Sequence, residues 1–129
     1  MPDPIAYRNA PGVVSSSAYS HLTMANGFAF LAGQVPTDDM SRPKPSGDIA
    51  DETKVAMDNL ARVLETAGLG FEDVVRTNVY MADLAEFQRM NEVYVTYFPK
   101  GKLPARTTVG VAQLIDGCRI EIDCIARLR

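Results

Sequence analysis

The sequence predicts an α+β fold in which a mixed β-sheet carries two helices on one face. Two observations predict it. Short apolar segments bounded by turn residues are typical of strands, and two longer segments place apolar residues at helical spacing. Their order along the chain is β-β-α-β-α-β-β, and a further strand is expected near residues 5–8. The 129 residues suit one domain, which we assign to residues 1–129.

The first two of these strands are expected to form a hairpin over residues 20–34. Strand segments at 20–24 and 28–34 flank the dipeptide Asn26-Gly27. This dipeptide is typical of a type I′ turn, because both of its residues tolerate positive φ. The hairpin is followed by a proline-rich stretch, residues 36–47, which we interpret as a surface loop.

Two helices are expected, at residues 49–67 and 84–98. In the first, apolar residues recur three and four positions apart, Asp48 suits the N-cap, and Gly68 suits the C-terminal end. The second helix has one largely apolar face. This face consists of Phe87, Asn91, Tyr94 and Phe98.

The remaining strands are expected at residues 74–81, 107–113 and 119–126. Two helices can cover only one face of the sheet, yet strand 28–34 is apolar on both faces. We therefore expect the uncovered face to be buried by self-association. On the last strand, one face carries Ile120, Ile122, Cys124 and Ala126, and the other carries Arg119, Glu121, Asp123 and Ile125.

Charge and composition argue against several classes of protein. The net charge of −3 and the pI of about 5.1 make nucleic-acid binding an unfavoured function. No apolar run approaches the roughly 20 residues that cross a bilayer, and no secretory signal is recognised, so we expect a cytoplasmic protein. Cys118 and Cys124 would lie roughly 20 Å apart on one strand, too far for a disulfide. With a single histidine we expect no metal site.

Arg106 is the first candidate functional residue. It follows Pro104 and Ala105 at the start of a strand. A guanidinium held there could bind a carboxylate through two parallel hydrogen bonds. The residue pattern alone favours an ordinary solvated arginine.

Other polar residues are candidates with weaker support from the pattern. Glu121 would be a plain surface carboxylate if its face meets solvent, and a semi-buried acid suited to proton transfer if that face is an interface. Asn91 is expected to tie its helix to a nearby loop. His21 lies near several serines, but the Gly-x-Ser-x-Gly pattern of serine hydrolases is absent.

Several motifs together resemble a known family. They are Gly33-Gln34-Val35-Pro36, residues 73–80 followed by Asp83, a helix with Phe87, Met90, Asn91, Glu92, Val93, Tyr94 and Phe98, then Pro104-Ala105-Arg106 and Ile120-Glu121-Ile122. In this order and spacing they are similar to the Rid/YjgF family, also called translation-initiation-inhibitor-like or L-PSP endoribonuclease-like proteins. The resemblance covers about residues 19–126.

This resemblance implies a chorismate-mutase-like fold and a homotrimer, with three sheets forming a central barrel and ligand clefts between subunits. It implies deamination of reactive 2-enamines and 2-imines, such as 2-aminoacrylate and 2-iminopropionate, to 2-keto acids and ammonia, with no cofactor or metal. Arg106 would pair with the substrate carboxylate, and Glu121 would position or activate the water. The other implied substrate-binding residues are Tyr19, which closes over the ligand, Gly33 and Thr108 at the floor, and Phe87 and Asn91, which support the pocket.

Three departures from the family pattern bear on the substrate more than on the fold. Residues 17–21 replace the usual Gly-Pro-Tyr-Ser-Gln, Ala32 stands where serine is common, and Thr108 stands where deaminases often have cysteine. Three other functions stay open. They are a non-catalytic binder or regulator of small carboxylates, a pathway-specific deaminase or hydrolase that reads a larger substrate through residues 19–21, and a ribonuclease or translation inhibitor, which the acidic balance disfavours.

Overall fold

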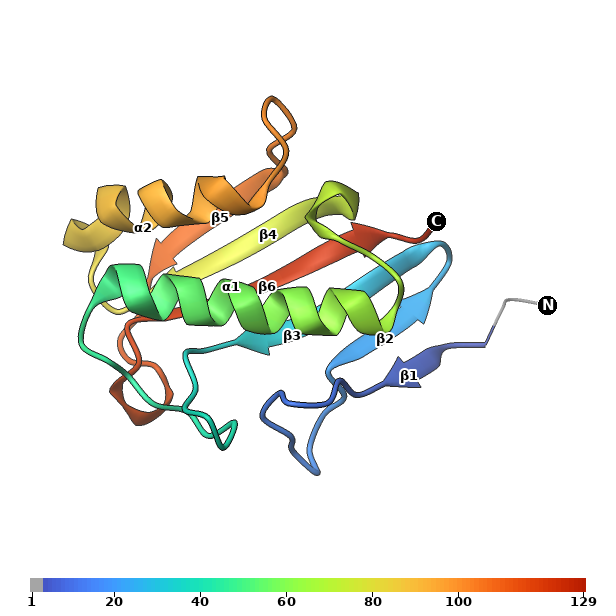
Figure 1. Ribbon diagram of the computed structural model, residues 1–129, viewed down its shortest axis with the longest axis horizontal. Helices are drawn as coiled ribbons and strands as arrows, with labels where there is room; N and C mark the ends of the chain where they lie inside the picture. The colour runs from blue at the N-terminus through green and yellow to red at the C-terminus, as the bar shows by residue number, and fades with distance from the viewer. Residues whose placement is uncertain (1–3) are drawn as a thin grey trace.

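A computed structural model describes residues 4–129 of the chain as one six-stranded sheet with two helices on the same face (Figure 1). The strand order is β1-β2-β3-β6-β4-β5, with β4 and β5 parallel and all other neighbours antiparallel. The predicted mixed sheet is thus confirmed. The strands are β1 (Ala6–Arg8), β2 (Leu22–Ala25), β3 (Phe28–Gln34), β4 (Val74–Met81), β5 (Ala105–Gly110) and β6 (Ile120–Arg127).

The hairpin between β2 and β3 is confirmed. Asn26 and Gly27 have φ values of 51° and 87°, as a type I′ turn requires. β2 begins at Leu22 and not at residue 20, because its pairing with β3 starts at the register Leu22↔Leu31.

β5 lies earlier in the chain than predicted, at Ala105–Gly110 and not at 107–113. Its length is set by its parallel pairing with residues 76–81 of β4, and the chain leaves the sheet after Gly110. Arg106 is therefore a strand residue, paired with Thr77.

Both predicted helices exist, with different ends for the second. Helix α1 spans Ile49–Thr66; the Asp48 side chain accepts a hydrogen bond from Ala50 N–H at 2.9 Å, and Gly68 has a φ of +71° just beyond the helix. Helix α2 spans Phe87–Tyr94 and is flanked by 3-10 turns on both sides, so the expected single helix 84–98 is wrong at its ends. Neither helix is long and apolar enough to span a membrane in the part of the chain that the structure describes.

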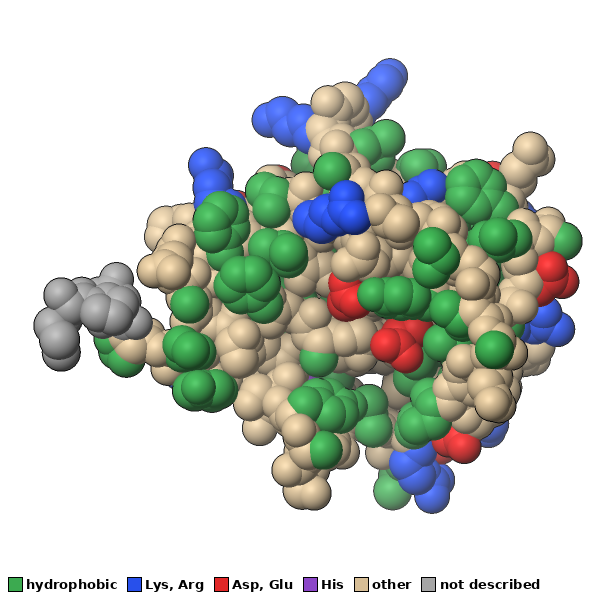
Figure 2. Space-filling model, turned by 180° about the vertical axis from the view of Figure 1, so that it is seen from behind, with side chains coloured by type: hydrophobic (Ala, Val, Ile, Leu, Met, Phe, Trp, Pro, Cys, Tyr) green, Lys and Arg blue, Asp and Glu red, His purple; other side chains and the backbone are tan. Residues whose placement is uncertain are grey.

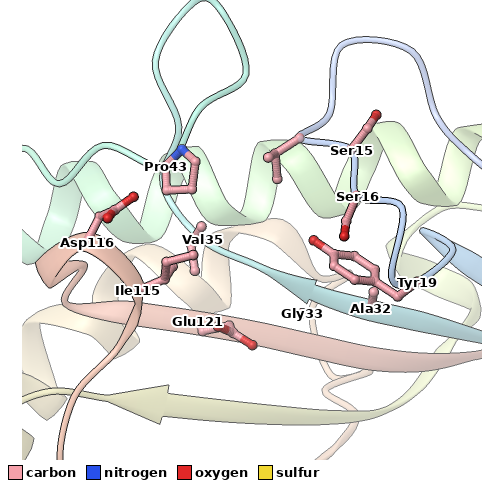
Figure 3. A pocket seen from close by; sticks show the side chains of 11 residues that line it. Ser15, Ser16, Tyr19, Ala32, Gly33, Val35, Pro43, Ile115, Asp116 and Glu121 are labelled. Carbon is pink, nitrogen blue, oxygen red and sulfur yellow. The ribbon is translucent and has the colours of Figure 1, made fainter.

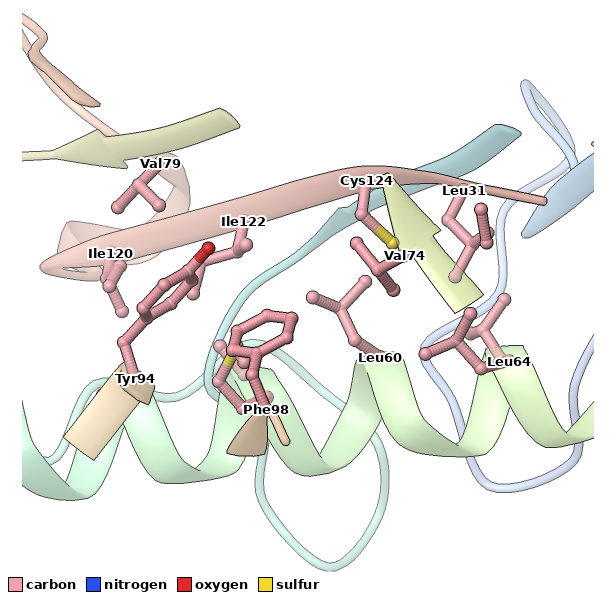
Figure 4. Packing of buried hydrophobic residues seen from close by; sticks show 14 of the residues in the cluster. Leu31, Leu60, Leu64, Val74, Val79, Tyr94, Phe98, Ile120, Ile122 and Cys124 are labelled. Atoms are coloured by element: carbon pink, nitrogen blue, oxygen red, sulfur yellow. The ribbon is translucent and has the colours of Figure 1, made fainter. Parts of the chain in front are cut away.

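The core fills the space between the two helices and the sheet (Figure 4). On β6, Ile120, Ile122, Cys124 and Ala126 are all buried, and the residues between them are only partly buried, as the alternation predicts. Both cysteines are buried free thiols. The helices thus cover one face of the sheet, and the opposite face stays open.

That opposite face is uncovered and partly apolar. Phe28 and Phe30 of β3 are 40% and 43% exposed, and Tyr7 of β1 is 61% exposed. Figure 2 shows apolar side chains gathered over one side of this face, with acidic side chains near its middle. A row of exposed aromatic rings is costly in water, so this surface is suited to burial against another protein surface. We call it the open face.

Candidate active site

The first part of the candidate site is a pocket of about 600 Å³ on the open face, with Glu121 and Gly33 at its floor (Figure 3). The Glu121 side chain lies directly over Gly33. A Cβ added to Gly33 would stand 2.9 Å from the Cδ atom of Glu121 and closer still to Oε2. The absence of a side chain at residue 33 is therefore what makes room for the carboxylate.

A β-bulge produces this arrangement. Leu31 pairs with Cys124 and Gln34 pairs with Ile122, so β3 contains one residue more than β6 over this stretch. A bulge bends the strand and re-aims its side chains. Here it places Ala32 and Gly33 beneath the pocket, while Gln34 is turned inward and is 1% exposed.

Acidic and phenolic groups surround Glu121 on the open face. Tyr80 is its direct partner across β4 and β6, and Asp123 is two residues along the same strand. Asp123 is held by two donors, Asn78 Nδ2 at 2.9 Å and the Tyr80 hydroxyl at 3.1 Å. Burial, and then the negative charge of Asp123, raises the pKa of Glu121 above its usual value. Such a carboxyl group is suited to exchange protons nearer to neutral pH.

The walls of the pocket come from loops. Tyr19, predicted to lie over the ligand, stands on one side with Ser15 and Ser16, and Ile115 and Asp116 stand on the other (Figure 3). The remaining lining residues are Val14, Ala32, Val35 and Pro43. The sequence offered no signal for Asp116 beyond an Asp-Gly turn, because its contribution depends on where its loop folds.

His21 supports the wall from behind. It is fully buried, and its Nδ1 atom accepts a hydrogen bond from Ala10 N–H at 2.7 Å. The ring proton is therefore on Nε2, which donates to the carbonyl oxygen of Val14 at 2.7 Å. His21 thus positions the segment that carries Val14 and the two serines, and it is absent from the pocket lining.

The second part of the candidate site is built around Arg106. Its Nη1 atom donates to Asn91 Oδ1 at 2.7 Å, and its guanidinium lies 4.8 Å from the ring centre of Tyr94 and 5.5 Å from that of Phe87. These contacts hold the planar fork in one orientation. Asn91 therefore ties α2 to strand β5, and our expectation that it would reach a loop is wrong.

A shallow pocket of about 430 Å³ lies beside Arg106. Its lining also contains Asn91, Tyr94, Val95, Leu103 and Pro104. Thr108 is two residues further along β5, on the same face of the sheet, and its Oγ1 atom is buried without a hydrogen-bond partner among the described residues.

A single chain does not bring the two parts together. Arg106 is paired with Thr77, a buried residue that faces the helices, whereas Glu121 is paired with Tyr80 on the open face. Directly paired residues share a face, so Arg106 and Glu121 lie on opposite faces of the sheet. Phe87, Asn91 and Thr108 lie with Arg106, and Tyr19 and Gly33 lie with Glu121.

Comparison with known proteins identifies the family. The sequence profile described as Endoribonuclease L-PSP matches residues 8–128. The chain belongs to this family, the YjgF/Rid family. It is 40% identical to a 2-iminobutanoate/2-iminopropanoate deaminase of Rattus norvegicus, over 95% of this chain and 87% of the rat protein. It is also 40% identical to RutC family protein PH0854 of Pyrococcus horikoshii, over 98% of each chain.

Solved structures share the fold. The yeast protein YEO7 superimposes with a TM-score of 0.91 at 31% identity, over 98% of this chain and all of the yeast chain. The YJGF gene product of E. coli superimposes with a TM-score of 0.81 at 32% identity, over 94% of each chain. In residues 4–129 no three histidine, cysteine or acidic side chains converge as a metal site would require.

Proposed function

We propose that this Rid-family chain hydrolyses reactive 2-enamines and 2-imines, such as 2-aminoacrylate and 2-iminopropionate, to 2-keto acids and ammonia. The curated relatives named 2-iminobutanoate/2-iminopropanoate deaminase, at 38–40% identity, support this reaction class. The observation that carries the proposal is that one chain holds a preoriented Arg106 fork and a semi-buried Glu121 with a raised pKa, each lining a pocket.

The two parts require a second copy of the chain, since they lie on opposite faces of one sheet. We propose a homotrimer in which the open faces form a central barrel and each cleft between subunits joins Glu121 of one copy to Arg106 of the next. The exposed rings of Phe28, Phe30 and Tyr7 support this assembly, because burying them would supply apolar contact area.

In this cleft Arg106 binds the substrate carboxylate through its two parallel N–H groups, and Asn91 keeps the fork in place. Glu121 orients a water molecule toward C2 of the imine and accepts a proton as the C2–O bond forms. That proton passes to nitrogen as the C=N double bond becomes single, which gives a carbinolamine. Glu121 then takes the hydroxyl proton and passes it to nitrogen, the C2–N bond breaks as the C2=O bond forms, and ammonia leaves with the 2-keto acid as the other product.

No cofactor is needed for this hydrolysis, because the carbon of a C=N bond is already electrophilic. Tyr19 covers the bound ligand, and Gly33 forms part of the floor. Phe87 supports Arg106. Thr108, on the same face of β5 as Arg106, would add to the floor from the neighbouring copy. The partner is a small carboxylate-bearing metabolite, and the place of action is the cytoplasm.

The test is the formation of pyruvate when a dehydratase releases 2-aminoacrylate in the presence of this protein. Arg106→Ala should lower the rate of protein-catalysed pyruvate formation by about 100-fold or more, because a charged pair of hydrogen bonds to the substrate is lost. Arg89→Ala is the matched control, since Arg89 is an exposed α2 residue whose ion pair with Glu92 lies on the surface.

Full activity in Arg106→Ala would remove the role assigned to Arg106. Saturable binding of pyruvate without any acceleration would instead favour a non-catalytic carboxylate binder.

A further inference from the structure

The pocket over Gly33 is acidic at two separate points. Its charged lining residues, within the described part of the chain, are Glu121 at the floor and Asp116 at the rim. The other lining residues are neutral, and apolar side chains predominate among them. No lysine or arginine lines this pocket in the described part of the chain, so none of the lining side chains can pair with a second negative charge on a ligand.

Asp116 reaches the rim through a defined turn. Asp116 and Gly117 both have left-handed backbone conformations, with φ values of 52° and 74°. Aspartate is one of the few residues with a side chain that tolerate this region. Hydrogen bonds from Gly117 N–H to Leu114 O at 3.3 Å and from Cys118 N–H to Ile115 O at 3.0 Å close the turn.

The chain after this turn is firmly anchored. Cys118 is fully buried, and the next backbone N–H, that of Arg119, donates to the buried Glu52 carboxylate at 2.7 Å. Glu52 also accepts from Gly47 N–H at 2.9 Å, which fixes the end of the proline-rich loop that carries Pro43. Asp116 is thus held on the pocket wall opposite Tyr19 (Figure 3).

We propose that Asp116 is a specificity-determining residue, which makes this cleft accept imines with neutral side chains and reject imines that carry a second carboxylate. The inference rests on the proposed function, in which Arg106 of another copy takes the first carboxylate. The substrate side chain then extends along a wall whose only fixed charge besides Glu121 is that of Asp116 within the described lining. Rejection by a like charge is a common source of specificity.

The matched substrates are the imines of glutamine and glutamate, which have the same size and differ by one charge. Both imines are released in situ by amino-acid oxidases. Semicarbazide traps the imine that has not been hydrolysed, so the decrease in semicarbazone formation measures the rate of hydrolysis. The wild-type protein should prefer the glutamine imine by about 10-fold or more in kcat/KM, since like charges in a cleft repel.

Asp116→Asn should reduce this preference several-fold, because the KM for the glutamate imine should fall. The kcat/KM for the glutamine imine should stay within about twofold of the wild-type value. Asp51→Asn removes an exposed carboxylate from the first turn of α1, outside the pocket, and should leave the preference unchanged. Raising the ionic strength should narrow the preference of the wild-type protein, because Asp116 is exposed and its charge is screened by salt.

An unchanged preference in Asp116→Asn would overturn the inference and leave the proposed function standing. If neither imine is hydrolysed, the formation of pyruvate from 2-aminoacrylate decides on the proposed function, and calorimetric binding of 2-oxoglutarate and 2-oxoglutaramate decides on Asp116 separately. Tighter binding of 2-oxoglutarate by Asp116→Asn than by the wild type would support the role of Asp116. Equal binding by the two proteins would refute it.

Discussion

At the scale of single residues, the contact between Glu121 and Gly33 is the tightest constraint in the candidate site. The glutamate reaches its position only because residue 33 has no Cβ, and the bulge in β3 brings the two together. A side chain at residue 33 must push the carboxylate away, since the bulge is fixed on both sides by the pairing of Leu31 and Gln34 with β6.

Gly33→Ala is therefore expected to reduce kcat by about 10- to 100-fold, because a shift of about 1 Å in a catalytic group has an effect of that size. The rate of imine hydrolysis measures it. Gly110→Ala is the control, since the closest contacts of a Cβ there, at 3.2 and 3.3 Å, are with the side chain of Leu84, which is 49% exposed and can move. Equal rates of hydrolysis by Gly33→Ala and the wild type would show that the reaction does not depend on the position of the Glu121 carboxylate.

At the scale of elements, the connection between β1 and β2 depends on His21. The ring bridges Ala10 and Val14, the backbone N–H of His21 donates to Asn9 Oδ1 at 3.0 Å, and its carbonyl oxygen accepts from Ala32 N–H at 2.9 Å. One residue thus joins the pocket wall to the strand that forms the floor.

His21→Ala is expected to lower the free energy of unfolding by about 2–4 kcal/mol, because it opens a cavity and leaves the buried N–H of Ala10 and the partly buried carbonyl of Val14 unpaired. Urea denaturation measures the change. His21→Gln should lower the free energy of unfolding by less, since an amide side chain can both donate and accept a hydrogen bond. The same loss of stability in both variants would mean that the two ring hydrogen bonds contribute little.

At the scale of the whole molecule, the open face decides the assembly. Phe30→Asp places a charge in the middle of the exposed aromatic surface, where a partner copy would have to bury it. We expect monomers by analytical ultracentrifugation and a parallel loss of imine hydrolysis, with the circular dichroism spectrum unchanged.

Met40→Asp is the control for this experiment, because Met40 is 68% exposed on the proline-rich loop and outside the sheet. A Phe30→Asp protein that stays monomeric and fully active would contradict both the trimer and the shared cleft.

Much of the fold could be predicted from local patterns, and less of the site could. The turn at Asn26-Gly27, the N-cap at Asp48 and the alternation along β6 each depend on neighbouring residues, so short stretches of sequence specify them. Local patterns do not predict the bounds of β5, because its pairing with β4 sets them and β4 lies more than twenty residues earlier in the chain.

The sequence by itself determined the order of the elements, the two faces of the last strand, and the residue types available for chemistry. The tertiary structure alone decided that Arg106 and Glu121 lie on opposite faces, that Glu121 rests on Gly33, and that Asp116 stands at the rim of the same pocket. The physical reason is register. Which face a strand residue shares with residues of distant strands depends on pairing, and a slip of one residue would reverse it.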